Sequence, residues 1–308
     1  MDPWQTLVSR CSAWWQMHTP HALRACIYDV CKPLVPLLLC IATLMALILY
    51  ALADNLHSFV CRIFIPQYHY PYAVPLAFIQ VFLNLLALLA LHGTGLIHLK
   101  PVSLKLAERL LVPAVCGSVQ CVLALWAEAS AHSGLYPLIA RFLPLVSLSL
   151  GHLFTLSMPG SIHVSCLLTA VTVTSVSVTA CQGLYMMEPL EYIYSPLSLV
   201  LHSLSLVWLA KVAQTERGHT SIFDLYYTLT VTRCLLLGFL CVLHPDGPEA
   251  LIQGTWHSLL FFGYMLGMLL LGAVQLLFVD VTALIFSALP AAVLHATRVL
   301  MLPLFSLL

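Results

Sequence analysis

The chain has 308 residues, of which 61% are hydrophobic and only 8% are charged, whereas an ordinary soluble domain has about 25% charged residues. Together with a mean hydropathy of +0.98, this composition excludes a soluble globular domain and predicts an all-α polytopic membrane protein. The lipid bilayer is therefore its first predicted partner. The 12 basic and 12 acidic residues cancel, so the net charge gives no indication of a nucleic-acid partner.

Apolar runs of about 20 residues, the length that crosses a hydrocarbon core, recur along the chain. Residues 1–32 contain no such run and are interpreted as a cytosolic N-terminal arm. The membrane domain follows at 33–308, in two halves. The predicted spans are 33–53, 72–93, 109–129, 134–156 and 162–182 in the first half (33–182), and 192–211, 222–243, 255–279 and 282–305 in the second half (192–308). Little besides Asp280 separates the last two. We predict about nine spans, with eight or ten as alternatives.

The basic residues outside the spans indicate the orientation, because cytosolic loops are enriched in lysine and arginine. With a cytosolic N-terminus, the residues on or beside the cytosolic side are Arg10, Arg24, Lys32, Lys100, Lys105, Arg109, Lys211 and Arg217. The opposite loops contain Arg62 and the acids Asp54, Glu188, Glu191, Asp246 and Glu249. Nine spans then place Leu308 on the lumenal or outer face.

Three arginines lie within predicted spans: Arg141 in the fourth, Arg233 in the seventh and Arg298 in the ninth. Ionisable residues at membrane depth usually face a bundle interior or a water-filled cavity. A structural salt bridge is the alternative for each, and Arg298 is near enough to a span end to snorkel to the interface. Arg141 is in the middle of its span, which favours a functional role.

Helical periodicity groups two of these arginines with other polar residues. The groups are Tyr226, Thr230 and Arg233 in span seven, and Ser287 and Arg298 with His295 on their flank in span nine. Guanidinium groups bind phosphate in a bidentate fork, and tyrosine rings stack on planar bases. The pattern therefore indicates a cavity for a phosphorylated organic anion, although simple packing also explains the small residues of span nine. No acidic relay is evident inside the spans, which favours exchange of anions over coupling to protons or sodium.

Metal and catalytic signatures are missing from the sequence. Its 11 cysteines form no C-x-x-C pair, and its 14 histidines form no H-E-x-x-H motif, so neither a metal site nor a redox site is predicted. No cofactor is expected. Paired carboxylates and a nucleophile elbow are also missing at the span ends, so we do not expect an enzyme.

Four stretches occur in an order that is typical of one transporter family. They are HYPYAVPLAFIQVFLNLLALLAL (69–91), SGLYPLIARFLPLVSL (133–148), SLVWLAKVAQTERGHTSIFDLYYTLTVTRCLLLG (205–238) and VDVTALIFSALPAAVLHATRVLM (279–301). The chain resembles the nucleotide-sugar transporters of the drug/metabolite transporter superfamily and, more distantly, the triose-phosphate translocators. The resemblance implies two inverted five-span repeats around a central site, the second lacking its last helix here. It also implies an antiporter that exchanges a nucleotide sugar for a nucleoside monophosphate across the Golgi or endoplasmic reticulum membrane.

Periodicity and the resemblance together give the candidate substrate-binding residues Arg141, Lys211, Tyr226, Tyr227, Thr230, Arg233, Ser287, His295 and Arg298. Arg141 corresponds to the basic residue of the family's fourth span, and Lys211 to a lysine of its sixth span. The chain departs from the family in span nine, where Pro290 and the uncharged run Ala291–Leu294 replace a glycine and a phosphate-binding lysine. Thr228 also replaces an asparagine after the tyrosines of span seven.

These departures leave a second function open, that of a transport-inactive relative acting as a membrane interaction or regulatory partner of the glycosylation machinery. A carrier for another amphipathic organic solute is a third possibility. The retained residues Arg141, Lys211, Tyr226, Tyr227 and Arg233 favour transport. A homodimer also remains open.

Overall fold

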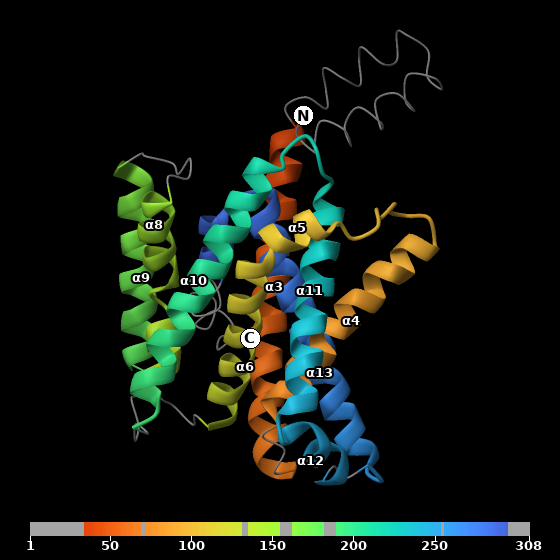
Figure 1. Cartoon of the computed structure of the whole chain (residues 1–308). Coiled ribbons are helices and arrows are strands. Elements are labelled where there is room, and N and C mark those ends of the chain that lie inside the picture. Colours follow the sequence, from red (N-terminus) through yellow and green to blue (C-terminus); the bar gives the residue numbers. More distant parts are fainter. Residues whose placement is uncertain are drawn as a thin grey trace. The chain divides into compact units, whose positions relative to one another are not determined.

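The computed structural model describes residues 34–68, 72–130, 135–154, 162–181, 189–253 and 256–294 (Figure 1). Within these ranges the secondary structure is helical and contains no strand. Contacts divide the chain into two units, Met1–Leu49 and Tyr50–Leu308, with the boundary inside the first described helix. The described part of the first unit is the beginning of that helix, and the second unit contains all the other described elements.

Helices cover the apolar runs of the sequence. In order they are α3 (Leu34–Tyr68), α4 (Ala73–Gly93), α5 (Leu104–Arg109), α6 (Leu111–Ser130), α7 (Leu135–Ala140), α8 (Leu143–Leu153), α9 (Ile162–Cys181), α10 (Glu191–Thr215), α11 (Ile222–Leu243), α12 (Asp246–Gln253) and α13 (Leu259–Ile285). A further helical segment occupies residues 288–294, at the end of the described chain. In lipid, a helix satisfies its own backbone donors and acceptors, which is why apolar runs of this length become helical.

Six helices of the described chain are long and apolar enough to cross a membrane. They are Leu44–Ile65 within α3, α4, Val164–Cys181 within α9, α10, α11 and α13. Shorter apolar helices, Leu111–Ala127 and Leu143–Leu153, occupy two more of the predicted spans. The described residues thus confirm a helical protein with several helices able to span a membrane. The count of nine spans and the inverted repeats stay predictions.

Two acidic residues lie inside helices, although the sequence predicted them between spans. α3 continues past 53 to Tyr68 and therefore includes Asp54, and α13 continues to Ile285 and includes the buried Asp280. Each carboxylate has a side-chain partner on another helix, Gln275 for Asp54 and Arg233 for Asp280. A paired acid can stay at membrane depth, so neither residue ends its helix.

The fourth predicted span is interrupted in its middle. α7 ends at Ala140, and α8 begins at Leu143. In the turn between them, the Arg141 amide donates to the Leu138 carbonyl at 3.2 Å, which is an i→i−3 bond in place of the helical one. Pro144 has no N–H to donate to the Ala140 carbonyl, so an unbroken helix would lose a hydrogen bond there. The break places Arg141 outside regular helix.

The ninth predicted span, 282–305, contains a similar break near its beginning. α13 ends at Ile285, and helix resumes at Ala288 with Pro290 in its first turn. Pro290 has no N–H to donate to the carbonyl of Phe286, the first residue after α13. Both interrupted spans therefore have a proline in the first turn of the helix that follows the break.

α4 and α11 pack against each other within the second unit. α4 also packs on α13, and α11 packs on α6, while α10 contacts α6, α7, α8 and α13. Aromatic residues close one end of this bundle, where the rings of Phe64 and Phe261 lie 5.3 Å apart between centroids. Trp256 and Tyr68 contact the Phe261 ring edge-on at 5.3 and 5.2 Å.

Candidate functional site

A polar cavity of about 510 Å³ lies among α3, α4, α6, α7, α9, α10 and α13. Its uncharged polar lining consists of Tyr50, Asn55, His57, Ser58, Gln80, Gln120, Tyr136, Thr179, Ser195, Ser198, His202 and Gln275. Two charged side chains, those of Asp54 and Arg141, also line it. Polar groups at membrane depth are costly unless they face water, a solute or one another. This cavity is therefore the leading candidate for a binding site.

Arg141 is the residue among the described sequence candidates that lines this cavity. The turn between α7 and α8 presents its side chain, which is half-buried. Pro137 and Leu143, on either side of the turn, line the cavity as well. The helix break thus gives the guanidinium a place at the cavity surface instead of in a helix–helix interface.

Asp54 brings a negative charge to the same cavity from α3. The Gln275 side chain of α13 donates from Nε2 to Asp54 Oδ1 at 2.9 Å, and both residues line the cavity. His57 lies one helical turn further along α3, with its Nε2 3.6 Å from the Cys61 sulfur. The α3–α13 wall therefore combines a carboxylate with an imidazole and an amide.

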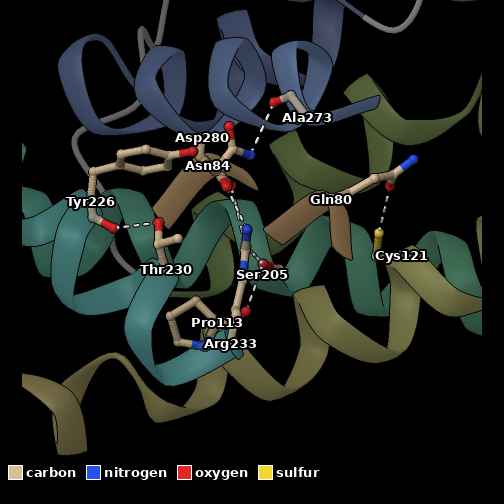
Figure 2. Close-up of polar contacts among 10 residues, drawn as sticks. All are labelled: Gln80, Asn84, Pro113, Cys121, Ser205, Tyr226, Thr230, Arg233, Ala273 and Asp280. Carbon is tan, nitrogen blue, oxygen red and sulfur yellow. Dashed lines mark hydrogen bonds and ion pairs between the residues drawn. The ribbon is translucent and has the colours of Figure 1, made fainter. Parts of the chain in front are cut away.

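Gln80 of α4 also lines the cavity, and Figure 2 shows its side chain beside that of Cys121. Its Nε2 donates to the Met268 carbonyl at 3.5 Å, and its Oε1 accepts from the Cys121 thiol at 4.0 Å. A Cβ added to Gly272 would overlap the Gln80 amide and come within 3.0 Å of His57 Nε2. Glycine at this position is what allows α4 and α13 to enclose the amide between them.

Arg233 is held in an ion pair away from the cavity lining (Figure 2). Its guanidinium binds the Asp280 carboxylate through both terminal nitrogens, and Nη2 donates to Oδ1 at 3.2 Å. The same nitrogen donates to the Ser205 hydroxyl at 3.5 Å, and this hydroxyl donates to the Pro113 carbonyl at 3.0 Å. Arg233 therefore links α11 to α13 and α10, the structural salt bridge named as its alternative in the sequence analysis.

The other members of the span-seven group are buried in helix packing. The side chains of Tyr226 and Thr230 are 2% and 3% exposed. The Thr230 hydroxyl donates to the Tyr226 carbonyl of its own helix at 2.7 Å (Figure 2). Tyr227 is half-buried and does not line the described cavity. Periodicity grouped Tyr226, Thr230 and Arg233 on one face correctly, and this face contacts neighbouring helices.

Lys211 lies at a separate, smaller cavity of about 210 Å³ beside α5, α6 and α10. Its Nζ is 5.4 Å from the centroids of both the Phe154 and Trp208 rings, a cation–π arrangement. Arg109 lines this small cavity too and forms an ion pair with Glu216. The structure thus does not bring Lys211 together with Arg141.

Three candidates come from the ninth predicted span. Ser287 lies in the turn after α13 and is half-buried, and it does not line the large cavity. His295 and Arg298 lie outside the described residues. The structure therefore does not bring the described candidate residues together at one site. Arg141 lines the large cavity, Lys211 lines the small one, and Arg233 is held in an ion pair.

Sequence reasoning missed most of the cavity lining, including Asp54, His57 and Gln275. One usable signal was present, because Asp54, His57, Ser58 and Cys61 recur at helical spacing on one face. Extending the first span beyond 53 would have revealed this polar face.

No family model matches the chain, and no curated protein matches it.

Proposed function

We propose that the protein is a membrane carrier that moves a nucleotide sugar or related organophosphate anion in exchange for a nucleoside monophosphate. The observation that carries the proposal is the polar cavity of about 510 Å³ with the Arg141 guanidinium at a helix break. Small-molecule sites typically measure about 300–1,000 Å³. Guanidinium is the protein group best suited to bidentate phosphate binding, and the amides and imidazoles of the lining suit a base and sugar hydroxyls.

An inverted-repeat organisation, which the resemblance implies, is supported by matched helix contacts. In the proposed order, α4 and α11 are the second helices of the two halves, and α6 and α13 are the third. α4 packs on α11, and the cross-contacts are reciprocal, since α4 packs on α13 and α11 packs on α6. A twofold relation between the halves produces this pattern of contacts.

Two further pairs of features follow the same relation. A Cβ on Gly117 of α6 would overlap the Arg233 guanidinium of α11, just as one on Gly272 of α13 would overlap the Gln80 amide of α4. In each case, a long polar side chain of one second helix occupies the space left by a glycine of the opposite third helix. The helix breaks at Arg141 and at Ser287 also fall in the fourth span of each half. These matches favour duplicated halves over an unrelated bundle.

The finer parts of the proposal are the nine spans, the cytosolic N-terminus and the residence in a Golgi or endoplasmic reticulum membrane. They rest on the loop charges and the resemblance. Arg141 is assigned to phosphate binding. Arg233 is assigned to helix packing because its guanidinium is occupied by Asp280.

Counterflow into liposomes tests the proposal. Purified protein is reconstituted into vesicles preloaded with one nucleoside monophosphate each, and uptake of labelled nucleotide sugars is screened. We expect uptake of at least one nucleotide sugar that depends on a matching preload and is lost in Arg141→Leu. Empty vesicles and vesicles with the variant are the controls. If no nucleotide sugar enters under any preload, the transport proposal is contradicted and the interaction-partner function is favoured.

A further inference from the structure

The two charges of the cavity belong to different walls. Asp54 is on α3 and is bonded to Gln275 of α13. Arg141 follows α7, which packs on α9 and α10. Because both residues line the same cavity, a solute inside it meets a cationic group on one wall and an anionic group on another.

The anionic wall is built to accept hydrogen bonds. An ionised carboxylate accepts hydrogen bonds and donates none, and Asp54 Oδ1 already accepts one from the Gln275 amide. Asn55 and His57, neighbours of Asp54 on α3, also line the cavity. Sugar hydroxyl groups are donors of the kind that such a carboxylate binds, and their hydrogen bonds to a charged group are stronger than those to a neutral one.

We infer that Asp54 determines specificity by accepting hydroxyl groups of a neutral sugar and rejecting sugars that carry a carboxylate. The inference rests on the proposed function, in which the phosphate end of the solute is held by Arg141. With the phosphate on the cationic wall, the sugar faces the anionic wall. A neutral hexose gains hydrogen bonds there, whereas a uronic acid places a second negative charge beside Asp54. Rejection by like charge is a general source of specificity.

A pair of ligands that differ at one carbon tests this assignment without assuming a nucleotide base. Glucose 1-phosphate has a CH2OH group at C6, and glucuronate 1-phosphate has a carboxylate there. Their affinities for the purified full-length protein are measured by calorimetry in detergent. We expect the wild-type protein to bind glucose 1-phosphate more tightly, and Asp54→Asn to reduce this preference by about 10- to 100-fold, the effect of one hydrogen bond to a charged group.

Three variants make the result specific. Asp54→Asn keeps the size of the side chain, and the Gln275 amide can rotate to pair with the new amide. Asp54→Glu retains the charge and should retain the sign of the preference, even if its geometry is altered. Asp246→Asn removes a carboxylate from α12, which is outside the cavity lining, and should leave the ratio of affinities unchanged.

The outcomes separate the inference from the proposed function. Wild-type protein that binds neither sugar phosphate contradicts the organophosphate site and, with it, this inference. Binding with no preference, or with a preference that Asp54→Asn leaves intact, overturns the role of Asp54 while the carrier proposal stands. An Asp54→Asn protein that unfolds is replaced by Asp54→Glu, for which a lost or reversed preference also counts against the inference.

Discussion

Arg233 and Arg141 are both arginines within predicted spans, yet the structure gives them different surroundings. Arg233 is 3% exposed and forms a bidentate pair with Asp280. Arg141 is half-buried at a cavity surface. The Asp280 carboxylate offsets the desolvation of the Arg233 guanidinium, whereas Arg141 lies among the polar side chains of the cavity lining. The same residue type therefore joins helices at one site and lines a polar cavity at another, where we propose that it binds a ligand.

Loss of Asp280 should destabilise the protein because it leaves the Arg233 guanidinium buried without its counter-charge. Asp280→Asn is expected to cost about 3–5 kcal/mol of unfolding free energy, measured as reduced thermal stability in detergent. Replacing both residues by apolar ones, Arg233→Met with Asp280→Leu, should recover much of this loss. If Asp280→Asn is as stable as the wild type but defective in uptake, Arg233 is a ligand-binding residue after all.

Arg141 substitutions should affect transport in proportion to the lost phosphate geometry. Arg141→Lys retains the charge without the planar fork, and we expect affinity for a nucleotide sugar to fall about 10- to 100-fold, since a charge-assisted hydrogen bond contributes about 1.5–3 kcal/mol. Arg141→Leu should abolish uptake. Thermal unfolding is recorded beside uptake, because a variant that loses stability and activity together would make Arg141 a structural residue.

The sequence reveals a charge within a span but not its partner. Arg233 and Asp280 are on different helices, so no periodicity within α11 indicates that they meet. A salt bridge could be named only as an alternative for every arginine. Asp54 was misplaced for a related reason, because an acid near the end of a 20-residue apolar run is most simply assigned to a loop. A partner on another helix, Gln275, allows the helix to continue.

At the scale of elements, close helix contacts depend on two glycines that no motif identified. Gly117 of α6 leaves space for Arg233 of α11, and Gly272 of α13 leaves space for Gln80 of α4. Each long polar side chain fills the gap between its own helix and the helix that carries the glycine. Small residues permit such close approach in membrane helices. Apolar runs predict where helices occur, but they carry no information on which glycine faces a neighbour.

Gly272→Ala should be more harmful than the same change one and a half turns earlier in α13. A methyl group at Gly272 forces the buried Gln80 amide to move, at a cost of about 1–3 kcal/mol for overpacking. Nothing lies within 4 Å of a Cβ at Gly267, so Gly267→Ala should be neutral or stabilising by about 0.5–1 kcal/mol. Thermal unfolding of both variants in detergent gives the comparison. Equal stability would mean that α4 and α13 are not packed through Gly272.

At the scale of the whole molecule, the positions of the spans were largely predictable, whereas their shapes were not. Each predicted span overlaps a described helix, because hydropathy and length decide where a chain enters a bilayer. The interruptions at Arg141 and at Ser287 were not predicted, although Pro144 and Pro290 were visible in the sequence. Proline can either kink a membrane helix or end it, and the surrounding helices decide which occurs.

Length and composition identify six helices that could cross the membrane, whereas we predict nine crossings. The sides on which the two termini lie can be measured and test this prediction. Gln120 of α6 and Arg141, between α7 and α8, line the same cavity as residues of α4 and α10, so we expect α6 and the α7–α8 pair to cross the membrane as well. With the segment that starts at Ala288, this gives an odd count. An odd count places the two termini on opposite sides of the membrane, and the loop charges then lead us to expect a cytosolic N-terminus and a lumenal C-terminus.

Epitope tags at the two ends, detected after selective permeabilisation of the plasma membrane, measure this directly. An N-terminal tag should be stained under these conditions, and a C-terminal tag should be stained only after the internal membranes are opened as well. A tag inserted beside Arg217, in the turn after α10, serves as the internal control, because the loop charges place that turn on the cytosolic side. Staining of both termini without opening the internal membranes would require an even number of crossings. In that case, the segment after α13 would not cross the membrane. The second half would then have fewer spans than a repeat of the first half that lacks only its last helix.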